Sequence, residues 1–110
     1  FNNLKHKNAN ALLEMIDILK GFNLFEAKHI KVLLGIINKK PKENDSIIRY
    51  LFANKFINFE IISECVKNKN DWIFDYPLAP HISNNNYTSL VAEVVKINSL
   101  NITNKFRIKI

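Results

Sequence analysis

Two acidic residues four positions apart are the side chains of this sequence best suited to contact a partner. Asp71 and Asp75 flank a short apolar stretch, and residues at positions i and i+4 of a helical turn lie on the same side. Two carboxylates so placed repel each other, and an Arg or Lys of a partner would relieve the repulsion. The alternative is that both acids serve the chain itself, with Asp71 capping or ending a turn and Asp75 bracing the turn at Pro77.

Trp72 follows the first of the two acids, and two interpretations of it are open. An exposed tryptophan is a frequent anchor of protein interfaces. Its neighbours Ile73 and Phe74 are apolar, which favours a place in the core instead. The predicted partner-binding residues are Asp71, Trp72, Asp75 and Pro77.

Residues that catalyse reactions or bind metals form no pattern elsewhere in the sequence. The histidines, His6, His29 and His81, are far apart and have no cysteine or paired carboxylate at metal-ligand spacing. The 2 glycines are too few for a phosphate-binding glycine-rich loop. Cys65 has apolar neighbours in a helical pattern, which is the setting of a buried, inert thiol. We therefore expect no enzyme activity, no cofactor and no metal.

The single cysteine also bears on the compartment in which the chain works. One thiol cannot form an internal disulfide, and a buried reduced thiol fits the cytoplasm. The 110 residues suit one domain, residues 1–110. Because the sequence starts at Phe1, we expect this domain to be excised from a longer polypeptide. No apolar run approaches the ~20 residues of a membrane helix, so we expect no membrane partner.

The net charge of +6 allows a nucleic-acid partner. The lysines are scattered, however, and the arginines are Arg49 and Arg107 alone, so no arginine-rich run is present. The abundance of Asn, Ile and Lys is typical of AT-rich coding sequence, which weakens any argument from the number of lysines. A weak RNA contact through the lysines is therefore an alternative to ordinary solvated helix faces.

Apolar residues at helical spacing predict an all-α fold. We expect about five helices, at residues 8–20, 26–37, 44–55, from 58 onward and 87–98. Gly21 would end the first helix at its C′ position, and Pro41 would stop the second. Residues 106–110 alternate apolar and basic side chains, which fits either a short strand or the start of a truncated helix. The residues expected in the core include Ile30, Leu33, Leu51, Phe59, Ile62, Leu90, Val91, Val94 and Val95.

The links between the expected helices are short, which favours antiparallel neighbours. A weak echo at a spacing of about 34 residues relates the surroundings of Phe22 and Phe25 to those of Phe56 and Phe59. Together these features predict stacked antiparallel helical hairpins of the HEAT-like kind.

The segment from Ile48 to Ile82 carries a pattern that resembles the MA3 domain family. An apolar helix precedes a second, capped helix, and an acidic and proline-containing motif follows. The matching residues of that motif are Asp71, Asp75, Pro77, Ala79 and Pro80. Residues 29–41 and 90–103 resemble neighbouring family helices, so the resemblance covers about residues 10–104. It is greatest to the MA3 domains of translation scaffolds of the eukaryotic initiation factor 4 gamma type, to which the programmed cell death 4 inhibitors are related.

The resemblance implies a non-catalytic adaptor that docks a DEAD-box RNA helicase of the initiation factor 4A type, in translation initiation or its regulation. In MA3 domains the two acids of the motif are implied to face the helicase, a role that would fall here on Asp71 and Asp75. Two further functions are compatible with the sequence: a basic helical RNA-binding module, and a structural piece of a larger α-solenoid.

Overall fold

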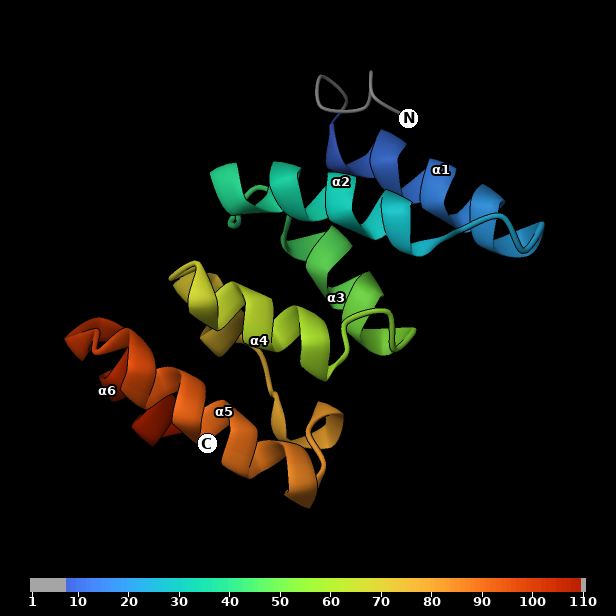
Figure 1. Ribbon diagram of the computed structural model, residues 1–110. Helices are drawn as coiled ribbons and strands as arrows, with labels where there is room; N and C mark the ends of the chain where they lie inside the picture. The colour runs from blue at the N-terminus through green and yellow to red at the C-terminus, as the bar shows by residue number, and fades with distance from the viewer. Residues whose placement is uncertain (1–7, 110) are drawn as a thin grey trace. The chain divides into compact units, whose positions relative to one another are not determined.

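A computed structural model describes residues 8–109 of the chain, and within them every regular element is helical (Figure 1). The elements, in chain order, are α1 (Ala9–Gly21), α2 (Ala27–Lys39), α3 (Asp45–Ala53), α4 (Phe59–Lys67), the 3₁₀ helices η2 (Asp71–Asp75) and η3 (Ala79–His81), α5 (Asn84–Ile97) and α6 (Leu100–Lys109). The predicted all-α fold is therefore confirmed. The chain divides into two compact units, Phe1–Phe56 and Ile57–Ile110, called unit 1 and unit 2.

Unit 1 contains α1, α2 and α3. Residues 22–26 connect α1 to α2, and Figure 1 shows that the chain runs in opposite directions along the two helices. Helix α1 packs against α3. Tyr50 Oη donates a hydrogen bond to Asp17 Oδ1 at 3.3 Å, and Lys20 Nζ donates to Asn54 Oδ1, so polar contacts at the edge also join α1 to α3. The side chains buried in this unit are mostly aliphatic: Leu12, Ile16, Leu33, Ile37, Ile47, Ile48, Leu51 and Phe52.

Unit 2 contains α4, η2, η3, α5 and α6. Both α4 and α6 pack against η2, and α5 packs against α4 and α6. An ion pair of 3.8 Å between Lys67 and Glu93 joins α4 to α5. Residues Leu100–Lys109 form α6, so the strand interpretation of residues 106–110 is wrong for its described residues, 106–109. Ile102 and Phe106 are buried at positions i and i+4 of α6, which supplies the apolar contact that holds this helix.

The predicted core is confirmed at most positions. Leu33, Leu51, Ile62 and Leu90 are fully buried, whereas Ile30 and Phe59 are half-buried. The prediction for Val95 is wrong, because 71% of this side chain is exposed. Val95 is one residue past the buried Val94, and one residue turns the helix by about 100°, so it points away from the contact that α5 makes.

Helix ends in this chain use left-handed residues other than glycine. Asn23, Lys55, Lys69 and Asn98 have φ between 53° and 60°, and no described glycine has a positive φ. After α1, for example, the amide of Leu24 donates to the carbonyl of Leu19 at 2.7 Å. This is the 6→1 hydrogen bond of a Schellman motif. Gly21 was expected at the C′ position, but it is the last helical residue of α1. The left-handed turn comes two residues later, at Asn23.

Candidate partner-binding site at residues 71–80

The segment 71–80 alternates between core and surface. It buries the side chains of Trp72, Ile73, Phe74, Tyr76 and Leu78. It exposes Asp75, Pro77, Ala79 and Pro80. Asp75, Pro77 and Ala79 each lie next to a buried residue, so the segment is anchored from Trp72 to Leu78 while it presents an acidic and proline-containing surface.

Trp72 belongs to the anchoring set, since only 4% of the residue is exposed. Its ring lies edge-on to that of Tyr76, with the centroids 6.3 Å apart. The interpretation of Trp72 as an exposed partner anchor therefore does not hold in this structure, and the core interpretation does. Phe74 is fully buried and meets Phe106 of α6 edge-on at 6.4 Å, so one aromatic contact lies within the segment and another joins it to α6.

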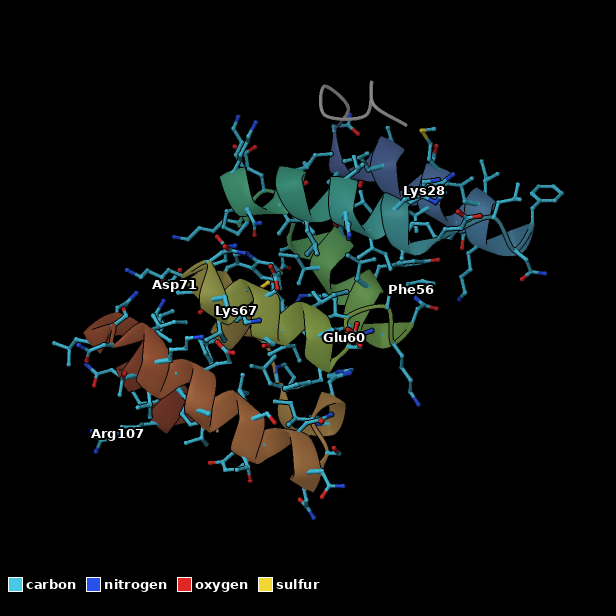
Figure 2. All side chains as sticks on the ribbon, in the orientation of Figure 1. Lys28, Phe56, Glu60, Lys67, Asp71 and Arg107 are labelled. Carbon is cyan, nitrogen blue, oxygen red and sulfur yellow. The ribbon has the colours of Figure 1, made fainter. Side chains whose placement is uncertain are left out.

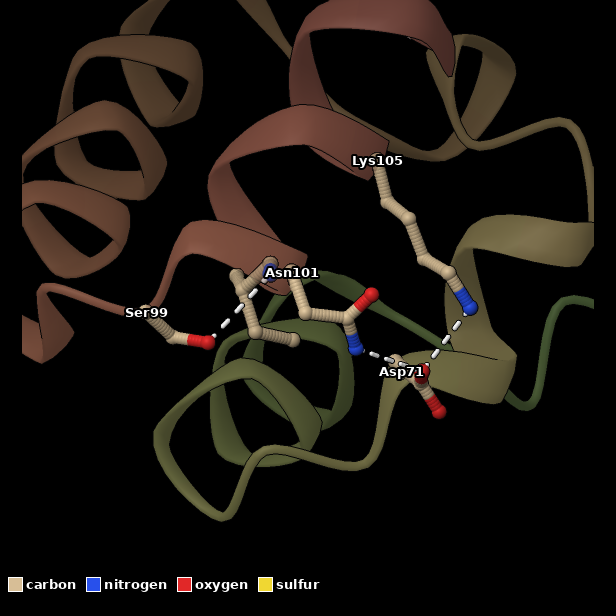
Figure 3. A network of polar contacts seen from close by, with 5 residues as sticks. Asp71, Ser99, Asn101 and Lys105 are labelled. Carbon is tan, nitrogen blue, oxygen red and sulfur yellow. Dashed lines mark hydrogen bonds and ion pairs between the residues drawn. The ribbon is translucent and has the colours of Figure 1, made fainter.

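Asp71 is bound within the chain by two residues of α6 (Figure 3). Lys105 Nζ lies 2.8 Å from Asp71 Oδ2, and Asn101 Nδ2 donates a hydrogen bond of 2.9 Å to the same oxygen. The hydrogen bond from Lys105 lowers the pKa of Asp71, and the bond from Asn101 adds to this effect. The same contact raises the pKa of Lys105. Asp71 therefore has an internal role: it fastens the start of η2 to α6.

Asp75 differs from Asp71 although the two acids lie in one short helix. Its side chain is exposed, and no hydrogen bond or ion pair to it is formed by residues 8–109. Its negative charge nevertheless contributes to the raised pKa of Lys105. No such bond supports the alternative in which Asp75 braces the turn at Pro77. A partner can reach Asp75 without displacing a residue of the chain, whereas Asp71 is already bound.

Asn101 and Lys105 are the residues of the site that sequence analysis missed. They follow Asp71 by 30 and 34 positions, and no local pattern connects positions so far apart. A helix over these residues would place Asn101 and Lys105 at positions i and i+4, on one side of it. The pattern of residues 106–110 fitted a strand as well as a helix, however, so the sequence left this assignment open.

The side chains that most often bind metals form no cluster in the described part of the chain. Within residues 8–109, no group of three or more His, Cys, Asp or Glu side chains could hold a metal ion. Cys65 is 3% exposed, and burial, together with the charge of Glu64, raises the pKa of its thiol to about 12. A thiol in this state is a poor nucleophile at neutral pH. Over the same residues, no helix has the length and apolar character needed to cross a membrane.

Comparisons with protein-family models, with curated proteins and with solved structures found no match to this chain.

Proposed function

We propose that this chain is a non-catalytic adaptor that binds another protein through the exposed residues of the 71–80 segment. The observation that carries the proposal is the alternation of that segment, with Asp75, Pro77, Ala79 and Pro80 at the surface and five anchors in the core. A surface that is already ordered loses little conformational entropy on binding. The exposed carboxylate of Asp75 favours a partner with a basic surface.

The partner that the resemblance to MA3 domains suggests is a DEAD-box RNA helicase of the initiation factor 4A type, in the cytoplasm and during translation initiation. Four of the five motif residues that carry the resemblance are exposed. The fifth, Asp71, is partly exposed, with 39% of its side chain accessible. In this proposal Asp75 contacts the partner, whereas Asp71 positions the segment through Lys105.

A binding titration with the purified helicase tests the proposal. Asp75→Lys should weaken binding at least tenfold, which corresponds to about 1.4 kcal/mol, because it removes an acidic contact and adds a like charge. The matched control is Glu64→Lys, which makes the same charge change at an exposed position of α4. Thermal unfolding of both variants should remain close to that of the unmodified chain, since both side chains are exposed. Equal binding by the two variants and the unmodified chain would exclude Asp75 as a contact.

A further inference from the structure

The solvent-facing side of α2 is a strip of positive charge. Lys28, Lys31 and Lys39 are all exposed, and at 100° per residue they fall within about 80° of one another around the helix axis. At 1.5 Å per residue they extend over about 16 Å of helix length. Figure 2 shows Lys28 on α2, near one end of this strip. Residues 27–42 contain five lysines and no acidic residue.

Little of this charge is neutralised by neighbours. Lys28 lies 3.5 Å from Glu26, but both side chains are well exposed. Lys31 and Lys39 form no ion pair with any residue in the range 8–109, and the same holds for Lys42 just beyond the helix. Lys39 contributes to the fold by lying at the negative end of the helix dipole. Lys31 is in the second turn of α2, where the dipole offers no such reason for a cation.

Gly35 lies at the centre of the strip, close to the mean angular position of the three lysines around the helix axis. A Cβ built at Gly35 would meet no atom within 4 Å, so internal packing does not require a glycine there. Glycine also destabilises the middle of a helix relative to alanine. Because glycine has no side chain, the helix surface between Lys31 and Lys39 is shallow. An elongated ligand can therefore approach the helix backbone there.

The other exposed residues of α2 decide which ligand class fits. They are Ala27 and Asn38, and neither is a large apolar or aromatic side chain. Protein interfaces rely on such side chains as anchors, and a helix that lies on a membrane needs an exposed apolar face, whereas α2 buries Leu33 and Ile37 in unit 1. Lysine ammonium groups without apolar anchors suit a row of phosphates, to which each contributes a point charge.

From these features we propose that the α2 strip, defined as Lys28, Lys31, Gly35 and Lys39, binds the phosphodiester backbone of a nucleic acid without reading its sequence. This site is separate from the acidic 71–80 segment, and the two can be tested independently. The strip offers few cations, so binding is weak and strongly dependent on salt.

Fluorescence anisotropy with labelled oligouridylate of about 20 nucleotides, at about 50 mM salt, measures this binding. The double variant Lys31→Ala/Lys39→Ala should bind at least tenfold more weakly. Its plot of log affinity against log salt concentration should be shallower by about 1.4, because each phosphate contact to a single strand contributes about 0.7. The matched control Lys69→Gly/Lys96→Ala removes two positive charges from exposed positions of unit 2, and should bind within about twofold of the unmodified chain. An equal loss in both double variants would overturn the assignment to α2.

A second variant keeps the test independent of lysine removal. Gly35→Glu leaves all lysines in place and improves the helix propensity of the position, yet it should reduce binding at least tenfold, whereas Gly35→Ala should retain it. Circular dichroism checks that both variants remain helical. Unchanged binding by Gly35→Glu would contradict the proposal.

A further probe identifies the ligand chemistry. Oligothymidylate of equal length should bind about as well as oligouridylate, because the phosphodiester backbone is common to both. Binding of only one of the two oligonucleotides would overturn a backbone site.

Discussion

The α2 strip and the 71–80 segment are both exposed charged surfaces, but they are built in opposite ways. The strip is a regular helix face, and its lysines come together because the helix repeats every 3.6 residues. The 71–80 segment consists of η2, the start of η3 and the three residues between them, and its exposed residues are held in place by buried neighbours and by α6. Changes on the strip should therefore alter charge and leave the fold intact, whereas changes at Asp71 or at the buried residues of the 71–80 segment should reduce stability.

The largest expected loss of stability comes from a buried residue of the 71–80 segment. Phe74→Ala should reduce the free energy of unfolding by about 3–5 kcal/mol, because it deletes a fully buried aromatic ring. Urea denaturation measures this loss. The matched control is Phe22→Ala, since Phe22 is 73% exposed and its change should remain within about 0.5 kcal/mol. Similar losses for both variants would show that the segment is not anchored as described.

A smaller effect of opposite sign is expected on the α2 strip. Gly35→Ala should raise the free energy of unfolding by about 0.5–1 kcal/mol, because alanine restricts the unfolded chain and favours the helix. The added methyl group meets nothing within 4 Å. Thermal and urea unfolding measure the gain. A destabilised variant would mean that another part of the molecule covers this face.

The smallest effect on stability is expected at Asp71. In its ion pair, 39% of the Asp71 side chain and 36% of the Lys105 side chain are exposed. Asp71→Asn should cost about 0.5 kcal/mol at neutral pH, since solvent screens such pairs. Asp75→Asn, the matched control, should change stability by less. Urea unfolding of the two variants separates a bound acid from a free one, and equal costs would remove the distinction drawn between them.

The pH dependence of that cost has a definite sign. The pKa of Asp71 is lower in the folded chain than its ordinary value of 3.8, so its contribution to stability is present above about pH 4 and is lost as the pH falls below it. The unmodified chain and Asp71→Asn should therefore converge in stability as the pH falls through the folded-state pKa of Asp71. A difference that persists unchanged in acid would show that the charge of Asp71 is not its source.

Sequence analysis predicted the helices better than it predicted the contacts of the 71–80 segment. Helical spacing was sufficient for α1 to α5 and for most of the core, because those patterns are local. It was wrong for Val95, because burial on α5 also depends on what packs against it. For Trp72 it left a partner anchor and a core residue both open, and the side chain is buried. The partners of Asp71 could not be predicted, since they lie on a helix whose own pattern is weak: among residues 100–108 of α6, the buried ones are Ile102 and Phe106.

The bond between Asp71 and Lys105 has a consequence for the chain during its synthesis. The ribosome adds about 5–20 residues per second, so the 34 residues from Asp71 to Lys105 take roughly 2–7 s. During that interval the nascent segment 71–80 lacks the lysine that neutralises Asp71 and the phenylalanine of α6 that covers Phe74. The face of Phe74 that meets Phe106 stays uncovered until α6 is made, although α4 is already available to pack against η2. During that interval a chaperone has this apolar surface to bind.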